Sequence, residues 1–355
     1  MAEDEDIGLI TAALHHHQEG LNLFIRHLAT PDAYSWVTFP SLWLFILYEQ
    51  MYGKDPKVMQ AHLRGVRDVI ASHGRSVIAF STERNPDSLS DEPKDRYRVP
   101  PQIINQITLW TIHQDAKAST FGLGGSMIDL LNEEYPDLIQ QISEDSSNAL
   151  RDAWGLMYPA AEELWDIQAG EMSKLVHETT MLRYKLTKIE NGDSTQNPRN
   201  MIQLGRELKL LEKKFSPFIK TVFSPRKERN SMVSNMCVIV AEFLALVVLH
   251  DRLAYDIQSS RLSNLLQACA ILYECEGPNF LRHVAWAMFV AGFETDDIIH
   301  ESWIIDRFAQ LQRSGNNIRR AMTLLQTVFL EKRTSIRHIS YSEWLQDDRF
   351  EKFTI

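Results

Sequence analysis

The sequence predicts an all-helical fold, arranged as a single large bundle of antiparallel helices without a sheet. Only 15 glycines and 13 prolines occur among 355 residues, fewer than average usage supplies, which disfavours strand-rich folds with frequent tight turns. No segment shows the sustained alternation of apolar and polar residues that marks a half-buried strand. Apolar residues recur instead at helical spacing, and with 44% hydrophobic residues the chain can bury a large core. We therefore expect one helical domain over residues 1–355.

The first helix is predicted from an apolar stripe whose members follow spacings of three and four residues. The stripe consists of Ile7, Ile10, Leu14, His17, Leu21, Phe24 and Leu28. Thr30-Pro31 is expected to end the helix. We interpret it as a long helix lying on the core, with His17 half-buried and satisfied, because no flanking charge pattern supports a coiled coil.

The second and third helices are expected to form a hairpin with both ends specified by the sequence. The second runs from about Tyr34 to Met51. Asp55 suits the N-cap of the third helix, and Pro56 suits its first position. Apolar residues lie along one face of the third helix, and Gly74 is expected to end it.

Helices joined by loops are expected to make up the rest of the chain. Residues 82–101, with four prolines, and the polar residues 191–198 are predicted to be mobile surface loops. The expected helices cover approximately residues 102–118, 128–141, 146–157, 160–189, 200–215, 233–253, 260–273, 280–291, 298–312, 318–332 and 342–349, with breaks near Ser143 and Pro159. The turn Gly122-Leu123-Gly124-Gly125 lacks the Lys-Ser/Thr pair of a P-loop and a preceding strand, so it predicts a connection between helices.

Charge and cysteine content exclude several classes of function. A formal net charge of −10 argues against nucleic-acid binding by this chain, which would need clustered Lys and Arg. The short basic run 225–229 is expected to be a solvated loop, with nuclear import as the alternative. The three cysteines show no metal-binding spacing and lie in apolar helical segments, so we predict no metal and no cofactor. The cysteines are Cys237, Cys269 and Cys275.

The chain is expected to be intracellular and to lack a membrane span. Its acidic start differs from the positive, apolar profile of a signal peptide. The longest apolar run, from Met236 to Leu249, is interrupted by Glu242 and is shorter than the ~20 residues needed to cross a bilayer. We interpret this run as a buried core helix.

One acidic segment resembles a magnesium-binding motif. Asp296, Asp297 and Glu301 lie within six residues, and paired carboxylates of this kind hold magnesium in all-helical enzymes that act on prenyl diphosphates. No second metal motif accompanies them, and acidic residues are also common in the first turn of a helix, where they complement its dipole. The consecutive histidines 15–17 point in different directions from a helix and cannot chelate one ion. We therefore expect no enzyme, and we keep the prenyl diphosphate enzyme as an alternative.

Two distant stretches carry a resemblance to a known family. The first is Leu47 to Gly53, followed by His62-Leu63-Arg64-Gly65, and the second is Trp286 to Glu294. Together with Leu109-Trp110, the glycine turn after Phe121 and the final Trp344, they resemble the fungal-specific transcription factor domain, the regulatory domain of fungal zinc-cluster transcription factors. The similarity spans about Ala12 to Trp344. Ala287 and Val290 stand where the family often has Pro and Ile.

The resemblance implies an all-helical domain that regulates transcription in the nucleus, or that stays in the cytoplasm until activated. It implies DNA binding only through a six-cysteine zinc cluster, which is not in this sequence. The chain is then either the regulatory part of a longer factor or a protein that has lost the DNA-binding module. The implied partners are other transcription proteins or a second copy of the chain.

The resemblance also suggests a lipophilic ligand, because one branch of the family binds a sterol. Apolar residues in the C-terminal half could line a lipophilic cavity, or they could fill the core. These residues are Phe243, Leu244, Val247, Val248, Trp286, Phe289 and Phe293. A helical scaffold without a ligand, associating through the stripe of the first helix, is a further alternative.

Overall fold

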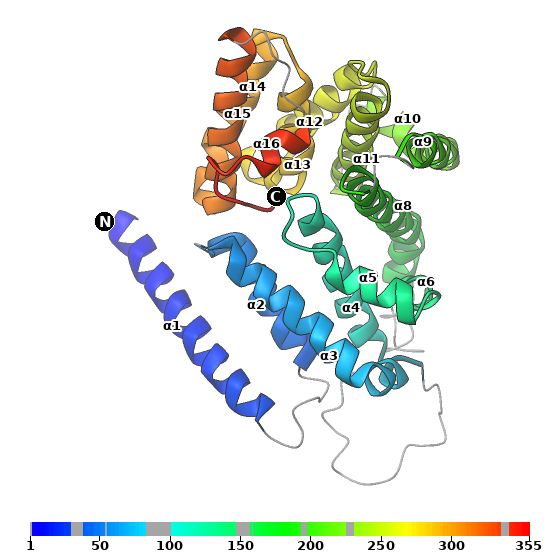
Figure 1. Cartoon of the computed structure of the whole chain (residues 1–355), viewed down its shortest axis with the longest axis vertical. Helices are drawn as coiled ribbons and strands as arrows, with labels where there is room; N and C mark the ends of the chain where they lie inside the picture. The colour runs from blue at the N-terminus through cyan, green and yellow to red at the C-terminus, as the bar shows by residue number, and fades with distance from the viewer. Residues whose placement is uncertain are drawn as a thin grey trace. The chain divides into compact units, whose positions relative to one another are not determined.

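The protein is described here from a computed structural model, which covers residues 2–29, 38–53, 55–82, 101–146, 157, 159–192, 197–224, 231–334 and 341–355. These residues form helices and short connections, with no strand among them (Figure 1). The predicted all-helical class is therefore confirmed. The predicted loop 82–101, the helix expected over 146–157 and the basic run 225–229 lie almost entirely outside the described residues.

The chain divides into two compact units, each built from separate stretches of sequence. Unit 1 comprises Met1–Glu49, Lys57–Ile112 and Ser126–Glu163, and unit 2 comprises Gln50–Pro56, His113–Gly125 and Leu164–Ile355. Crossings between the units lie within helices α2 (Thr38–Tyr52), α4 (Pro101–Ser119) and α8 (Ala160–Glu190). The single domain over residues 1–355 stays a prediction.

Unit 1 contains α1 (Ala2–Leu28), most of α2, α3 (Pro56–Thr82), the first part of α4, α5 (Ser126–Glu134) and α6 (Leu138–Ser146). Helix α3 begins at Pro56, as predicted. The ring of Phe24 on α1 packs edge-on against Phe45 of α2, with centroids 5.6 Å apart. On α3, the side chains at positions 59, 63, 66 and 70 are all buried. The apolar face predicted for the third helix is thus the face that α3 buries.

Two helix ends in unit 1 differ from the prediction. Helix α3 continues through Gly74 to Thr82, because a glycine inside a helix costs only about 1 kcal/mol and need not end it. The helix predicted over 128–141 is divided into α5 and α6 at Pro136, since proline cannot donate a backbone hydrogen bond and clashes with the preceding turn. The expected break near Ser143 is wrong, because α6 extends to Ser146.

His17 is half-buried, as predicted, but its contacts are not hydrogen bonds. Its ring stacks on Tyr48 with centroids 3.8 Å apart, and its Nε2 lies 3.6 Å from a carboxylate oxygen of Glu49. That nitrogen makes no hydrogen bond, and burial lowers the pKa of His17. Leu14 and Leu28 of the same stripe are exposed, and the ring contacts of α1 with α2 come from His17 and Phe24.

Unit 2 holds the second half of the chain and the longer list of helices. They are α8 (Ala160–Glu190), α9 (Asn197–Lys214), α10 (Ser216–Phe223), α11 (Ser231–Tyr255), α12 (Leu262–Glu276), η4 (Pro278–Val284), α13 (Ala285–Glu294), α14 (Ile298–Leu311), η5 (Gln312–Ser314), α15 (Asn316–Thr334) and α16 (Tyr341–Gln346). Most of these ends lie within three residues of the predicted ones. Helix α10 was not predicted, and η4 with α13 replaces the single helix expected over 280–291.

The core of unit 2 is built around α11 and α13, which contact each other and α12. All ten residues of α13 are buried. Helix α11 is the one helix among the described residues that is long and apolar enough to cross a membrane, but 61% of its most apolar window is buried inside the protein. This burial fits the interpretation of α11 as a core helix.

The short segment 50–56 belongs to unit 2 and is hydrogen-bonded to the start of α15. Asn317 Nδ2 donates a hydrogen bond of 2.8 Å to the carbonyl of Gln50, and Asn316 Nδ2 donates one of 3.4 Å to the carbonyl of Gly53. Gly315 has a φ of 132°, and a Cβ there would lie 2.1 Å from the carbonyl oxygen of Met51. Only glycine therefore fits this position.

Candidate functional site

The residues predicted to line an apolar pocket lie in the interior of unit 2, on α11 and α13. Phe243, Leu244, Trp286, Phe289 and Phe293 are at most 3% exposed. Phe289 packs edge-on against Phe353 and Tyr341, and Phe293 also packs against Tyr341. Val248 is fully buried and Val247 is half-buried.

None of these residues lines either of the two cavities described below. Their role as a ligand pocket stays a prediction.

A buried arginine organises the polar interior of unit 2. Arg183, on α8, is 2% exposed, and its Nε donates a hydrogen bond of 2.9 Å to Thr120 Oγ1. Its guanidinium carbon lies 3.6 Å from the ring centroid of Trp286, in a cation–π contact. Trp286 in turn donates from Nε1 to the hydroxyl of Tyr341 at 3.3 Å. The arginine thus connects the end of α4, helix α13 and the first residue of α16.

Glu242 on α11 is the carboxylate that faces this arginine. Its Oε2 lies 3.6 Å from Arg183 Nη1, a separation that allows an ion pair without a hydrogen bond. Burial raises the pKa of Glu242, and the neighbouring cations Lys117 and Arg183 counteract that rise. Burial also lowers the pKa of Arg183 to about 10 and lowers the pKa of Lys117. In both cases the Glu242 carboxylate acts in the opposite direction and raises the pKa. The three charges are therefore mutually dependent.

Two neighbouring cavities open beside this charged group, and both lie within unit 2. The first has a volume of about 100 Å³. Its polar lining residues are Lys117, Thr179, Thr180, Arg183, Glu242 and His283. The second is a more open groove of about 280 Å³, whose lining is mainly apolar. The two share Val176, Val238, Ile239 and His283, so the charged cavity continues into the apolar groove.

Four helices position the lining of the charged cavity. Lys117 comes from the last turn of α4, the two threonines and Arg183 from one face of α8, Glu242 from α11 and His283 from η4. Thr179 and Arg183 are four residues apart, which places them on the same side of α8. Burial, with Arg282 and Lys117 nearby, lowers the pKa of His283, so its imidazole is neutral at pH 7.

A pair of buried histidines lies on the same two helices, α4 and α8. His113 Nε2 and His177 Nδ1 are 3.1 Å apart and share a hydrogen bond. Burial and the neighbouring His177 hold the pKa of His113 at about 3, and burial lowers the pKa of His177. Both rings are therefore neutral near pH 7, as a buried hydrogen-bonded pair requires.

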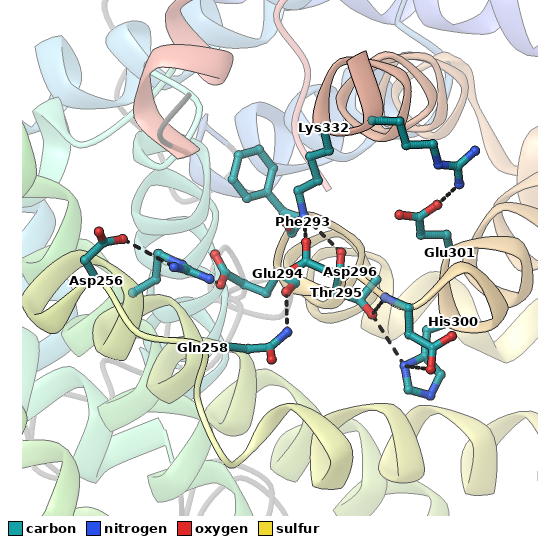
Figure 2. Close-up of polar contacts among 12 residues, drawn as sticks. Asp256, Gln258, Phe293, Glu294, Thr295, Asp296, His300, Glu301 and Lys332 are labelled. Atoms are coloured by element: carbon teal, nitrogen blue, oxygen red, sulfur yellow. Dashed lines mark hydrogen bonds and ion pairs between the residues drawn. The ribbon is translucent and has the colours of Figure 1, made fainter. Parts of the chain in front are cut away.

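The acidic segment between α13 and α14 is held by basic side chains of unit 2. Lys332 of α15 donates from Nζ to the backbone carbonyls of Phe293 and Thr295, at 2.6 and 2.9 Å, and also to Asp296 Oδ1 at 3.2 Å. Glu294, 2% exposed, accepts a hydrogen bond of 2.8 Å from Arg252. Figure 2 shows Lys332 reaching the end of α13, with Asp296 beside it.

The three carboxylates of the magnesium alternative have separate partners. Asp297 is the N-cap of α14 and accepts from the backbone N–H of Ile299 at 2.8 Å. Glu301 is buried and accepts a hydrogen bond from Arg333, and Figure 2 shows it apart from Asp296. No group of three or more metal-ligating side chains forms among the described residues. The acidic residues thus serve as a helix cap and as ion-pair partners.

The residues that line the charged cavity could not be predicted from the sequence, apart from one indication at Glu242. Glu242 interrupts an otherwise apolar run, and a carboxylate in such a run requires a buried partner. Arg183 and Lys117 come from distant stretches, so no spacing rule relates them to Glu242. Of the cysteines, Cys237 and Cys269 are buried as predicted, whereas Cys275, near the end of α12, is exposed.

Comparison with known proteins gives one result. The family described as fungal specific transcription factor domain matches residues 3–350. Among curated proteins and solved structures, no match was found.

Proposed function

Because this chain belongs to the fungal specific transcription factor domain family, we propose that it regulates transcription in response to a lipophilic small molecule. The family supports a transcription-regulating role and favours a role without catalysis. The match over residues 3–350 is the observation that carries this proposal. The finer part, the response to a small molecule such as a sterol, is supported by the apolar-lined groove of about 280 Å³ in unit 2, a size close to the lower end of small-molecule sites.

The proposal includes where and with what the chain acts. It acts in the nucleus, with DNA bound through a zinc cluster outside this sequence, and it contacts other transcription proteins or a second copy of itself. The formal net charge of −10 supports DNA binding by a separate zinc cluster and not by this chain, since an acidic surface repels phosphate. A ligand that binds one conformation better than another would shift the balance between a masked and an exposed state.

A reporter assay tests the transcriptional role directly. Residues 1–355 are fused to an unrelated DNA-binding module, and expression is measured from a promoter that carries the operator of that module. We expect expression to differ from that given by the DNA-binding module alone. The Lys209→Met fusion, which changes an exposed residue of α9, serves as the control and should behave like the parent. Expression equal to that of the module alone, at equal protein levels, would refute the proposal.

Thermal unfolding tests the response to a lipophilic ligand. A ligand that binds only the folded state stabilises it by about 2.7 kcal/mol at a concentration one hundred times its dissociation constant. We therefore expect the melting temperature of the chain to rise with saturating sterol or another lipophile. A melting temperature that stays constant across a panel of sterols, fatty acids and long-chain alcohols contradicts ligand control.

A further inference from the structure

We infer that the charged cavity and the adjoining groove form one binding site for a lipophilic carboxylate, with the carboxylate among Lys117, Arg183 and Thr179 and the hydrocarbon in the groove. The inference rests on the proposed function only for its regulatory meaning. It adds the chemical class of the ligand and the residues that select it.

The first support is the balance of charge in the cavity. The lining contains two basic side chains, Lys117 and Arg183, and one acidic side chain, Glu242, while the imidazole of His283 is neutral at pH 7. Among the described residues the Lys117 ammonium makes no hydrogen bond, and its pKa, which burial lowers, is raised by Glu242 and lowered by Arg183. The lining therefore has one more basic side chain than acidic side chains. A single carboxylate balances this excess, whereas a cationic ligand would increase it.

The second support is the presence of two buried polar atoms that make no hydrogen bond. Arg183 Nη1 and Thr179 Oγ1 make no hydrogen bond, and their residues are 2% and 4% exposed and line the charged cavity. Buried donors without acceptors are uncommon in folded proteins and call for an explanation. Both groups donate hydrogen bonds, and a carboxylate offers two acceptor oxygens. The unsatisfied atoms thus match an anionic head group.

The third support is the continuity of the charged cavity with an apolar surface. Met172, Val176, Val238, Ile239 and Phe280 line the groove, and three of them also line the charged cavity. A hydrocarbon chain that leaves the carboxylate can pass these shared apolar side chains into the groove. A free phosphate or a short acid would leave the groove empty, so the combined site favours an acid with a long apolar chain.

Thr180 provides an internal comparison for Thr179. It lines the same cavity, but its Oγ1 donates to the carbonyl of Val176 at 2.8 Å. Its only hydroxyl proton is therefore used, and it has no donor left for a carboxylate. Of two adjacent threonines, only Thr179 should affect the binding of an acid.

Calorimetric titration of the full 355-residue chain with dodecanoate and with 1-dodecanol tests the inference. Both ligands are used at pH 7.5 and below the concentration at which they aggregate. The two share a hydrocarbon chain and differ in the charge of the head group. We expect dodecanoate to bind at least about tenfold more tightly, the ratio typical of a hydrogen bond to a charged group. Equal affinities, or the absence of saturable dodecanoate binding, would overturn the inference.

Three variants locate the site. Lys117→Met should remove most of the preference for dodecanoate. Thr179→Val should weaken dodecanoate binding several-fold and 1-dodecanol binding less, because an alcohol oxygen is a weaker acceptor than a carboxylate. Thr180→Val should leave the preference intact. Thr179→Val removes a buried hydroxyl that makes no hydrogen bond, so this protein should fold at least as stably as the parent. Lys117→Met removes a cation that acts on Glu242, so urea unfolding is used to confirm that this protein is folded before it is titrated. A preference that persists in Lys117→Met contradicts the assignment.

The outcomes separate this inference from the proposed function. If the fusion regulates the reporter while dodecanoate does not bind, the site assignment fails and the transcriptional role stands. If dodecanoate binds as expected and the fusion leaves the reporter unchanged, the transcriptional role fails and the site stands.

Discussion

Replacement of Gly124 by alanine should destabilise the protein strongly, although it adds a single methyl group. A Cβ at this position would lie 2.3 Å from the carbonyl oxygen of Asp115 and 2.8 Å from the Cβ of Ala118. Both atoms are fixed to the backbone of α4 and cannot rotate away. Overpacking of a filled interior usually costs about 1–3 kcal/mol, and a clash with backbone lies at the upper end. We expect a loss of roughly 3 kcal/mol in the free energy of unfolding.

The same substitution at Gly170 is the matched control. Gly170 lies inside α8, and a Cβ there meets no atom within 4 Å. Alanine is favoured over glycine in a helix by about 0.8–1 kcal/mol, so Gly170→Ala should stabilise the protein. Urea unfolding followed by tryptophan fluorescence measures both effects. A Gly124→Ala protein that loses less than about 1 kcal/mol, or two variants that change stability in the same direction, would refute the reasoning.

The remaining predictions use the same urea titrations. His113→Gln should flatten the dependence of stability on pH. Folding lowers the pKa of His113 to about 3, so the unfolded chain takes up the proton at a higher pH than the folded protein. This residue should therefore cost the parent about 2 kcal/mol of stability between pH 7 and pH 5. A parent whose stability is constant over that interval contradicts this linkage. Lys332→Met removes two hydrogen bonds to backbone carbonyls and should cost about 2 kcal/mol of stability. The control Lys209→Met, at an exposed position, should cost less than about 0.5 kcal/mol. Equal losses in the two variants would contradict a stabilising role of the Lys332 hydrogen bonds. Asp297→Ala removes the N-cap of α14 and should cost about 1 kcal/mol, whereas Asp297→Asn should retain most of that stability.

The parts of the fold that follow from local chemistry could be predicted from the sequence. Asp55 and Pro56 predicted the start of α3, and the glycines at 122–125 predicted the connection between α4 and α5, where Gly122 and Gly125 have positive φ. Helix ends that depend on packing could not be predicted in this way. Gly74 is tolerated inside α3, so a residue that often ends helices does not end this one.

The candidate site was beyond prediction because its residues meet only in three dimensions. The apolar residues of α11 and α13 show the same sequence pattern whether they fill a core or surround a ligand. Arg183 lies in a helix with many charged residues, and nothing near it in the sequence shows that it is buried against Trp286. A contact between positions more than one hundred residues apart leaves no local pattern.

The separate stretches that form unit 2 restrict how the protein can be dissected. A fragment that begins at residue 164 would lack residues 113–125, which supply Lys117 and Thr120 to Arg183. It would also lack Gln50 and its neighbours, which bond to the start of α15. Expression of the C-terminal half alone should therefore give an aggregation-prone chain. A protease that cuts between residues 125 and 164 should instead leave two pieces that stay associated, because each holds part of the same core.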